Sequence, residues 1–107
     1  LDETWVWAVA PFNPVPADGA TVSSGDVLLE WILPEPNQPG SIVTCDVYWG
    51  TDPNIINNEK IIDNQMVESA LVSADFGQVY YWQIITYQGG IKDVTGPVFT
   101  FNTLNQP

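Results

Sequence analysis

The sequence predicts an all-β fold, a β-sandwich of seven antiparallel strands, and three observations carry that prediction. Nine prolines and eight glycines in 107 residues favour strands and turns over helices. Short runs of β-branched and aromatic residues lie between turn signals every eight to twelve residues or so, which is the spacing of a sandwich. Apolar and polar residues alternate within these runs, as they do in strands with one buried face. A chain of this length forms one domain, 1–107.

The N-terminal part contains one predicted strand and one edge segment. Residues 5–9 are predicted to form a short strand with Trp5 and Trp7 on one face. Residues 11–20 contain three prolines, which a central strand cannot accept because proline lacks the N–H that the ladder needs. We therefore expect an extended edge segment that ends in an Asp-Gly turn.

Two strands follow, and each directs large residues toward the core. In 27–32, Trp31 is spaced by two from Leu29 and shares its inward face. A proline-rich loop over 34–40 separates this strand from 42–49, the clearest strand in the sequence. Cys45 lies on the inward face of 42–49, so we expect it to act as a small buried hydrophobe.

The C-terminal half is predicted to hold the remaining strands. Short strands are expected near 60–62 and 67–72, and a long strand over 79–88. Paired glycines and a Gly-Pro pair bracket 89–97, which we predict to be a loop. The last strand is expected over 98–103.

Five segments of the chain occur in the order and at the spacing of a known module. They are Asn13-Pro14-Val15-Pro16-Ala17-Asp18-Gly19-Ala20-Thr21-Val22, Leu29-Glu30-Trp31, Asp46-Val47-Tyr48-Trp49-Gly50-Thr51-Asp52-Pro53, Tyr80-Tyr81-Trp82-Gln83-Ile84 and Phe99-Thr100-Phe101-Asn102-Thr103. Together they resemble a fibronectin type III module, most closely the version found in large secreted bacterial proteins. The resemblance covers about 13–103 and leaves 1–12 as an extra N-terminal strand.

The resemblance implies a fold, a core and a setting. It implies an Ig-like Greek key and a non-catalytic module at the cell surface or outside the cell, acting as a spacer or an interaction surface in a larger bacterial protein. It also implies that the hydroxyl of Tyr80 bonds back to the preceding corner. The residues expected to build the core are Trp31, Val47, Trp49, Tyr80, Trp82, Ile84, Phe99 and Phe101.

The net negative charge of the chain excludes some classes of binding partner. Lys60 and Lys92 are the only basic residues against thirteen acidic ones, which gives a net charge of -11. Phosphate backbones repel such a surface, so we expect no nucleic acid partner. No apolar stretch approaches the length of a membrane span, so we expect no membrane insertion.

The chain has few residues of the types that catalysis and metal binding require. With no histidine and only two lysines, acid–base and nucleophile constellations are nearly absent, and we predict no enzyme activity. The same shortage disfavours zinc. Asp52, Asn54 and the asparagines that follow, and Asp2-Glu3, are the only groupings to consider for calcium, and neither has the spacing of a calcium loop. We predict no metal site and no cofactor.

One face of the predicted sandwich carries a candidate contact surface. The outward side chains of 42–49 and 79–88 include Tyr48, Tyr81, Gln83, Ile85 and Tyr87. These strands are neighbours in a fibronectin-type sandwich, so the side chains would form one patch. Exposed rings with polar neighbours suit polysaccharide, and an apolar strip equally suits a neighbouring module.

Three functional hypotheses remain at the level of the sequence. A spacer predicts no ligand, and its partners are neighbouring modules of the same polypeptide. A carbohydrate-binding module predicts that the three tyrosines of the patch are exposed together. A self-assembling filament or surface-layer subunit predicts that Trp5 and Trp7, or the tail near Leu104, contact another copy.

Overall fold

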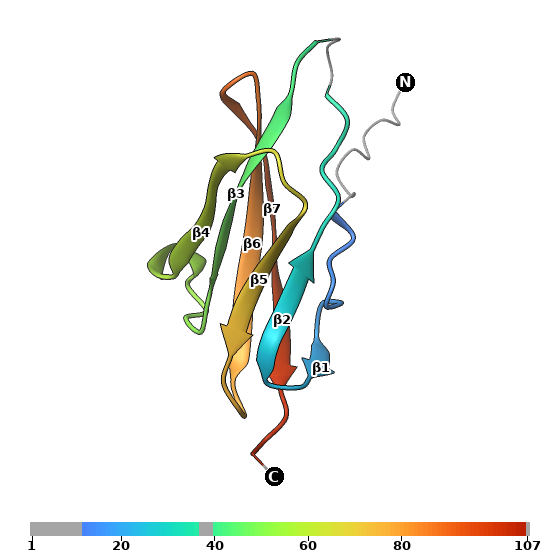
Figure 1. The fold of residues 1–107 in the computed structure, drawn as a ribbon. Helices are drawn as coiled ribbons and strands as arrows, with labels where there is room; N and C mark the ends of the chain where they lie inside the picture. Colours follow the sequence, from blue (N-terminus) through green and yellow to red (C-terminus); the bar gives the residue numbers. More distant parts are fainter. Residues whose placement is uncertain (1–11, 37–39, 107) are drawn as a thin grey trace.

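The computed structural model describes residues 12–36 and 40–106, and these form an all-β, sandwich-like fold (Figure 1). The strands are β1 Ala20–Val22, β2 Gly25–Glu30, β3 Val43–Gly50, β4 Glu59–Gln65, β5 Ser69–Ala74, β6 Val79–Gln88 and β7 Ile91–Thr103. A short 3₁₀ turn, η2, covers Ile55–Asn57. The strand predicted over 5–9, with Trp5 and Trp7, lies outside the described residues.

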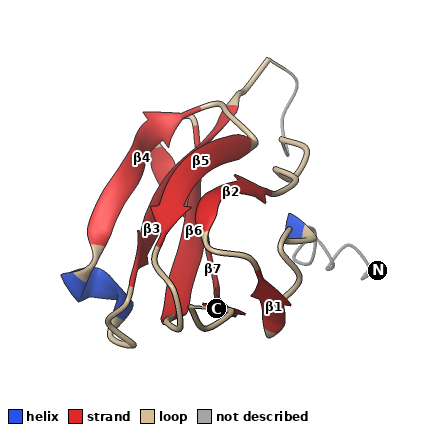
Figure 2. Cartoon of the chain, turned by 60° about the horizontal axis from the view of Figure 1, so that its bottom comes forward, coloured by secondary structure: helices blue, strands red, loops and turns tan. Residues whose placement is uncertain are grey.

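The strands form two sheets that face each other (Figures 1 and 2). The large sheet has the order β1-β7-β6-β3-β4, and the small sheet consists of β2 and β5. The inward side chains alternate with outward ones along each strand, as in Leu29 on β2, Val72 on β5 and Trp82 on β6. The core therefore lies between the two sheets.

The expectation that every strand pairs antiparallel is wrong for β1. β1 runs parallel to the end of β7, with Ala20 opposite Phe101 and Val22 opposite Thr103. The proline-rich segment just before β1 pairs instead with the small sheet, where Val15 and Glu30 form an antiparallel bridge. The segment thus pairs first with the small sheet and then crosses to the large sheet, where its new neighbour β7 runs in the same direction as β1. The sheets are mixed as a result.

The C-terminal hairpin also differs from the prediction. The loop expected over 89–97 is only a tight turn at Gly89-Gly90, and β7 begins at Ile91. Gly96 and Pro97 lie inside β7 as a bulge, because Gln83 pairs with Val98 while Ile85 pairs with Thr95. The proline is tolerated because β1 reaches only the end of β7, which leaves this stretch at the sheet edge.

The bulge brings the chain close to its own N-terminal segment. A Cβ atom added at Gly96 would lie 2.8 Å from the ring of Phe12 and 2.8 Å from the carbonyl oxygen of Ile84. Only glycine fits such a close approach. Phe12 is buried there and closes one side of the core, a role that the sequence did not indicate.

The eight residues predicted for the core all lie in it. Seven of them are at most 7% exposed, and Trp49 is half-buried at the edge of the same cluster. The ring of Trp49 stacks on that of Tyr80 at 4.3 Å between centroids. Aromatic side chains of this size contribute strongly to the stability of a protein core. Cys45 is buried among them as expected, and burial raises the pKa of its thiol to about 11.

The corner before β6 is fixed by the tyrosine that the resemblance singled out. The backbone N–H of Asp75 donates to the hydroxyl oxygen of Tyr80 at 2.8 Å. The hydroxyl of Thr103 in turn donates to the carbonyl oxygen of Asp75 and accepts from the N–H of Gln78. These bonds satisfy backbone groups that the turn would otherwise leave unpaired.

Candidate functional site

The outward face of the large sheet is the candidate site, because it gathers the five residues predicted for the contact patch. The antiparallel register places Gln83 opposite Tyr48 and Ile85 opposite Asp46. Tyr87 and Tyr81 lie further along β6 in the same alternating pattern. The four apolar and aromatic members of the patch are half-buried, as is Gln83. The register therefore brings the predicted residues to one face.

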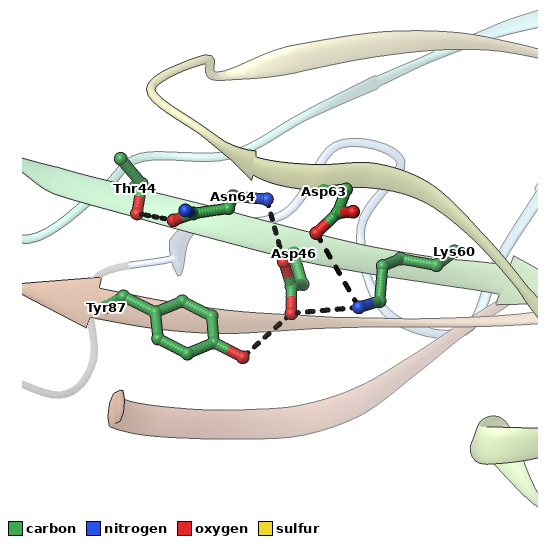
Figure 3. Close-up of polar contacts among 6 residues, drawn as sticks. All are labelled: Thr44, Asp46, Lys60, Asp63, Asn64 and Tyr87. Atoms are coloured by element: carbon green, nitrogen blue, oxygen red, sulfur yellow. Dashed lines mark hydrogen bonds and ion pairs between the residues drawn. The ribbon is translucent and has the colours of Figure 1, made fainter. Parts of the chain in front are cut away.

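Asp46 is the centre of this face, although it points away from the core. Only 3% of the residue is exposed, because neighbours surround its carboxylate (Figure 3). Oδ1 accepts from the backbone N–H of Asn64 at 2.8 Å, and Oδ2 accepts from the hydroxyl of Tyr87 at 2.8 Å. Nζ of Lys60 lies 3.6 Å from Oδ2. A buried charge requires such partners.

Two of these partners, the N–H of Asn64 and the amine of Lys60, lie on β4, whose pairing with β3 is irregular. β4 carries an extra residue at two places, because Cys45 pairs with Gln65, Val47 with Ile62 and Tyr48 with Lys60. Asn64 lies in the first bulge with φ of 53°, a left-handed conformation that asparagine tolerates better than most residues. This conformation turns its N–H toward Asp46, and its side-chain oxygen accepts a hydrogen bond from the hydroxyl of Thr44.

Charge around Asp46 changes the proton affinity of its neighbours. Asp46 is the main cause that raises the pKa of Lys60, and Asp63, 3.7 Å from the amine, acts in the same direction. The hydrogen bond to Asp46 is the main cause that raises the pKa of Tyr87. Both groups therefore hold their protons more tightly than in an unfolded chain.

This arrangement disfavours a role for the Lys60 amine as a nucleophile. Attack by an amine, including the formation of an isopeptide bond with a neighbouring carboxyl group, requires the neutral amine. The raised pKa of Lys60 works against that form. The Lys60 ammonium also lies 5.6 Å from the ring centroid of Tyr48, so the ammonium covers one face of that ring. The cluster is suited to holding β4 on β3.

The patch offers fewer free groups than the sequence predicted for sugar binding. A sugar platform needs an open ring face and unpaired polar groups at its rim. Lys60 covers one face of Tyr48, and the hydroxyl of Tyr87 already donates to Asp46. The side-chain N–H of Gln83 donates to the carbonyl oxygen of Gly96 at 2.7 Å. Tyr81 and Ile85 remain as the apolar part of the patch.

The other sequence candidates have structural roles or lie outside the described residues. Both carboxylate oxygens of Asp52 accept hydrogen bonds, from the N–H of Asn54 at 2.8 Å and the side chain of Asn57 at 3.1 Å. Asn58 bonds the backbone of Asp52 in both directions. These oxygens stabilise the turn after β3. Asp2 and Glu3 lie outside the described part, within which no group of three metal-binding side chains occurs.

A groove that the sequence did not indicate opens at the end of the sandwich where β3 begins. It has a volume of about 450 Å³, is open to solvent and is lined mainly by apolar side chains, among them Leu33, Ile42 and Met66. The loops on either side of it are far apart in the sequence, so no local pattern predicts it.

Comparison with known proteins yields no assignment. The chain matches no protein-family model and no characterised protein. Within residues 12–36 and 40–106, no helix is long and apolar enough to cross a membrane.

Proposed function

We propose that this chain is a fibronectin type III-like, non-catalytic spacer module in a larger secreted or cell-surface bacterial protein. The strand order supports the topology, because β4 lies beside β3 in the large sheet while β2 and β5 form the small one. The tyrosine corner at Tyr80 supports it as well. A spacer of this kind sets the distance between its neighbours and has to keep that distance under load.

The observation that carries the proposal is the parallel pairing of β1 with β7. β1 is the first named strand and β7 the last, and they lie side by side and run in the same direction (Figure 1). The chain enters β1 at one end of the pair and leaves β7 at the other. A force on the two chain ends therefore slides the strands along each other and loads all their hydrogen bonds at once.

The bonds across this pair are numerous for so short a strand. Gly19 N–H donates to the carbonyl oxygen of Thr100 at 2.8 Å, and Leu104 N–H donates to that of Val22 at 3.0 Å. The N–H of Thr100 donates to the Asp18 carboxylate at 2.8 Å. The side chain of Asn102 donates to the hydroxyl of Thr21. Side-chain bonds thus reinforce the ladder just before β1, at Asp18, and within it, at Thr21.

The polysaccharide alternative has less support, because the polar groups of Tyr87 and Gln83 and one face of Tyr48 are already engaged. Self-assembly through Trp5 and Trp7 involves residues outside the described part. The described molecule is also elongated, with extents of 51 × 26 × 21 Å, which suits a spacer.

Force spectroscopy on the full chain, held at its two ends between reference domains, tests the spacer proposal. We expect Asp18→Ala to lower the unfolding force, because it removes a bond of the loaded pair. Val72→Ala is the matched control, because it weakens the buried face of β5 without touching that pair. It should lower equilibrium stability and leave the force nearly unchanged. If the unfolding force of both variants falls in step with their equilibrium stability, the result contradicts the proposal.

A further inference from the structure

β5 is an edge strand with one hydrogen-bonded neighbour among the described residues. It pairs with β2 and forms the border of the small sheet (Figure 1). The pairing runs without a register shift from Gly25 opposite Ala74 to Glu30 opposite Ser69. The other border of β5 is therefore a straight, regular row of backbone groups.

The positions of the hydrogen bonds between β2 and β5 show which backbone groups of β5 point away from β2 along this border. Trp31 N–H donates to the carbonyl oxygen of Glu68, one residue before β5 begins. Hydrogen-bonded and non-hydrogen-bonded pairs alternate along an antiparallel ladder. The residues of β5 that bond β2 are therefore the even-numbered ones. The N–H and C=O groups of Ser69, Leu71 and Ser73 point away from β2.

The composition of this edge is unusual for an acidic chain. β5 contains no charged residue, whereas the edge strand β4 contains Glu59, Lys60 and Asp63. Charges and bulges are the devices by which proteins block edge-to-edge pairing, and β4 has both. β5 has neither, so its edge is open to pairing with another strand.

An exposed apolar pair lies beside the open edge. Leu71 is 64% exposed, and Leu28, directly opposite on β2, is 47% exposed. Both point to the outer face of the small sheet. A strand added at the β5 edge would cover one side of Leu71 and extend this apolar pair. An added strand with leucine at the matching place would continue the strip.

We propose that β5 pairs antiparallel with β5 of a second copy of this chain, with Leu71 on the two-fold axis. This register places Leu71 opposite Leu71 and Ser69 opposite Ser73, so the outward-facing groups of both strands meet as hydrogen-bonded pairs. It also keeps inward side chains with inward ones, because opposite residues in a ladder point to the same face. The product is a continuous sheet in the order β2-β5-β5-β2.

Charge opposes this pairing and gives it a distinctive salt dependence. Each copy carries a net charge of -11, and Glu68 and Asp75 flank β5 at its two ends. In the proposed register, Glu68 of one copy lies near Asp75 of the other. Salt screens this repulsion. Dimerisation should therefore strengthen as salt concentration rises, the opposite of an association driven by ion pairs.

Cysteine cross-linking in the full chain tests the register. The Cα atoms of two paired Leu71 residues would lie about 5.5 Å apart, within the range of roughly 4.4–6.8 Å that a disulfide needs. Ser73→Cys is the matched control on the same exposed edge. Each Ser73 pairs with Ser69, so two copies of residue 73 lie about 14 Å apart along the strands. The native Cys45 is buried with a raised pKa, which keeps its background low.

We expect Leu71→Cys to form covalent dimers at least tenfold faster than Ser73→Cys under mild oxidation, and faster in high salt than in low salt. The unmodified chain should also shift toward dimer with concentration and salt in size exclusion with light scattering. Equal cross-linking rates for the two variants would overturn the proposal. A chain that stays monomeric under all conditions would also overturn it, without bearing on the force measurement proposed above.

Discussion

β4 and β5 are both edge strands, yet the structure secures them in different ways. β4 is bulged at two places, and the carboxylate of Asp46 substitutes for a ladder acceptor by receiving the N–H of Asn64. β5 keeps a regular ladder with β2 and buries Val72 and Ala74 against the core. A strand that departs from regular pairing thus depends on one polar side chain, whereas a regular strand depends on backbone bonds and burial.

An edge strand that bulges and charges protect needs a further partner for the backbone groups that regular pairing would satisfy. The bulges and charges of β4 block foreign strands, but they leave backbone groups that need another partner. Asp46 supplies that partner, Tyr87 donates a hydrogen bond to its carboxylate, and the ammonium of Lys60 compensates its charge. β5 needs no such cluster, and within residues 12–36 and 40–106 no second strand pairs with its outer edge.

The largest effect is expected when the anchor of β4 is removed. Asp46→Ala should lower the free energy of unfolding by about 2–4 kcal/mol, because it leaves the N–H of Asn64 and the hydroxyl of Tyr87 without their acceptor. Urea denaturation followed by tryptophan fluorescence measures the change. Asp63→Ala is the control. Its carboxylate is 75% exposed, so its loss should cost at most about 0.5 kcal/mol. Equal losses for the two variants would contradict the role of Asp46.

A smaller effect concerns the pH dependence of the same anchor. Tyr87→Phe should lower the free energy of unfolding by about 1–2 kcal/mol at pH 8, because it removes the hydrogen bond to Asp46. Urea denaturation at a series of pH values should also show a weaker alkaline loss of stability in this variant. Tyr81→Phe is the control on the same strand, because its hydroxyl has no partner among the described residues.

The sign of this dependence follows from proton linkage. The pKa values of Tyr87 and Lys60 are raised in the folded chain, so above their ordinary values the folded state binds more protons than the unfolded state. Stability then falls with rising pH. The contribution is complete below about pH 10 and is lost as pH rises through the folded-state pKa values. Cys45 adds to the loss between its ordinary value of 9.0 and about 11. Stability that rises across this range would contradict the linkage.

The smallest effect is expected at the open edge. Leu71→Lys should change the free energy of unfolding by less than about 0.5 kcal/mol, because the side chain is 64% exposed and makes few contacts. Val72→Ala, on the buried face of the same strand, should cost more than about 1 kcal/mol. Thermal denaturation of the two variants distinguishes the faces. A large loss in Leu71→Lys at a concentration where the chain is monomeric would mean that another part of the same chain covers this edge, and that result would weigh against pairing there.

Local patterns predicted the strands that lie between clear turn signals. Period-two alternation along 79–88, between the turn signals at Gly77 and at Gly89-Gly90, placed β6 at the bounds that the structure has. It also placed the eight expected core residues between the sheets. The pattern failed where a strand continues through a signal that usually ends one. Gly96 and Pro97 indicated a loop, and the structure accommodates them as a bulge at a sheet edge.

The sequence by itself determined the all-β class and the inward and outward faces of the main strands. These follow from period-two alternation, which is a property of neighbouring residues. Only the tertiary structure decided that β1 joins β7 in parallel, that Asp46 is buried on an outward face, and that β5 has an open edge. Each of these depends on which strands lie side by side, and long-range pairing leaves no local trace in the sequence.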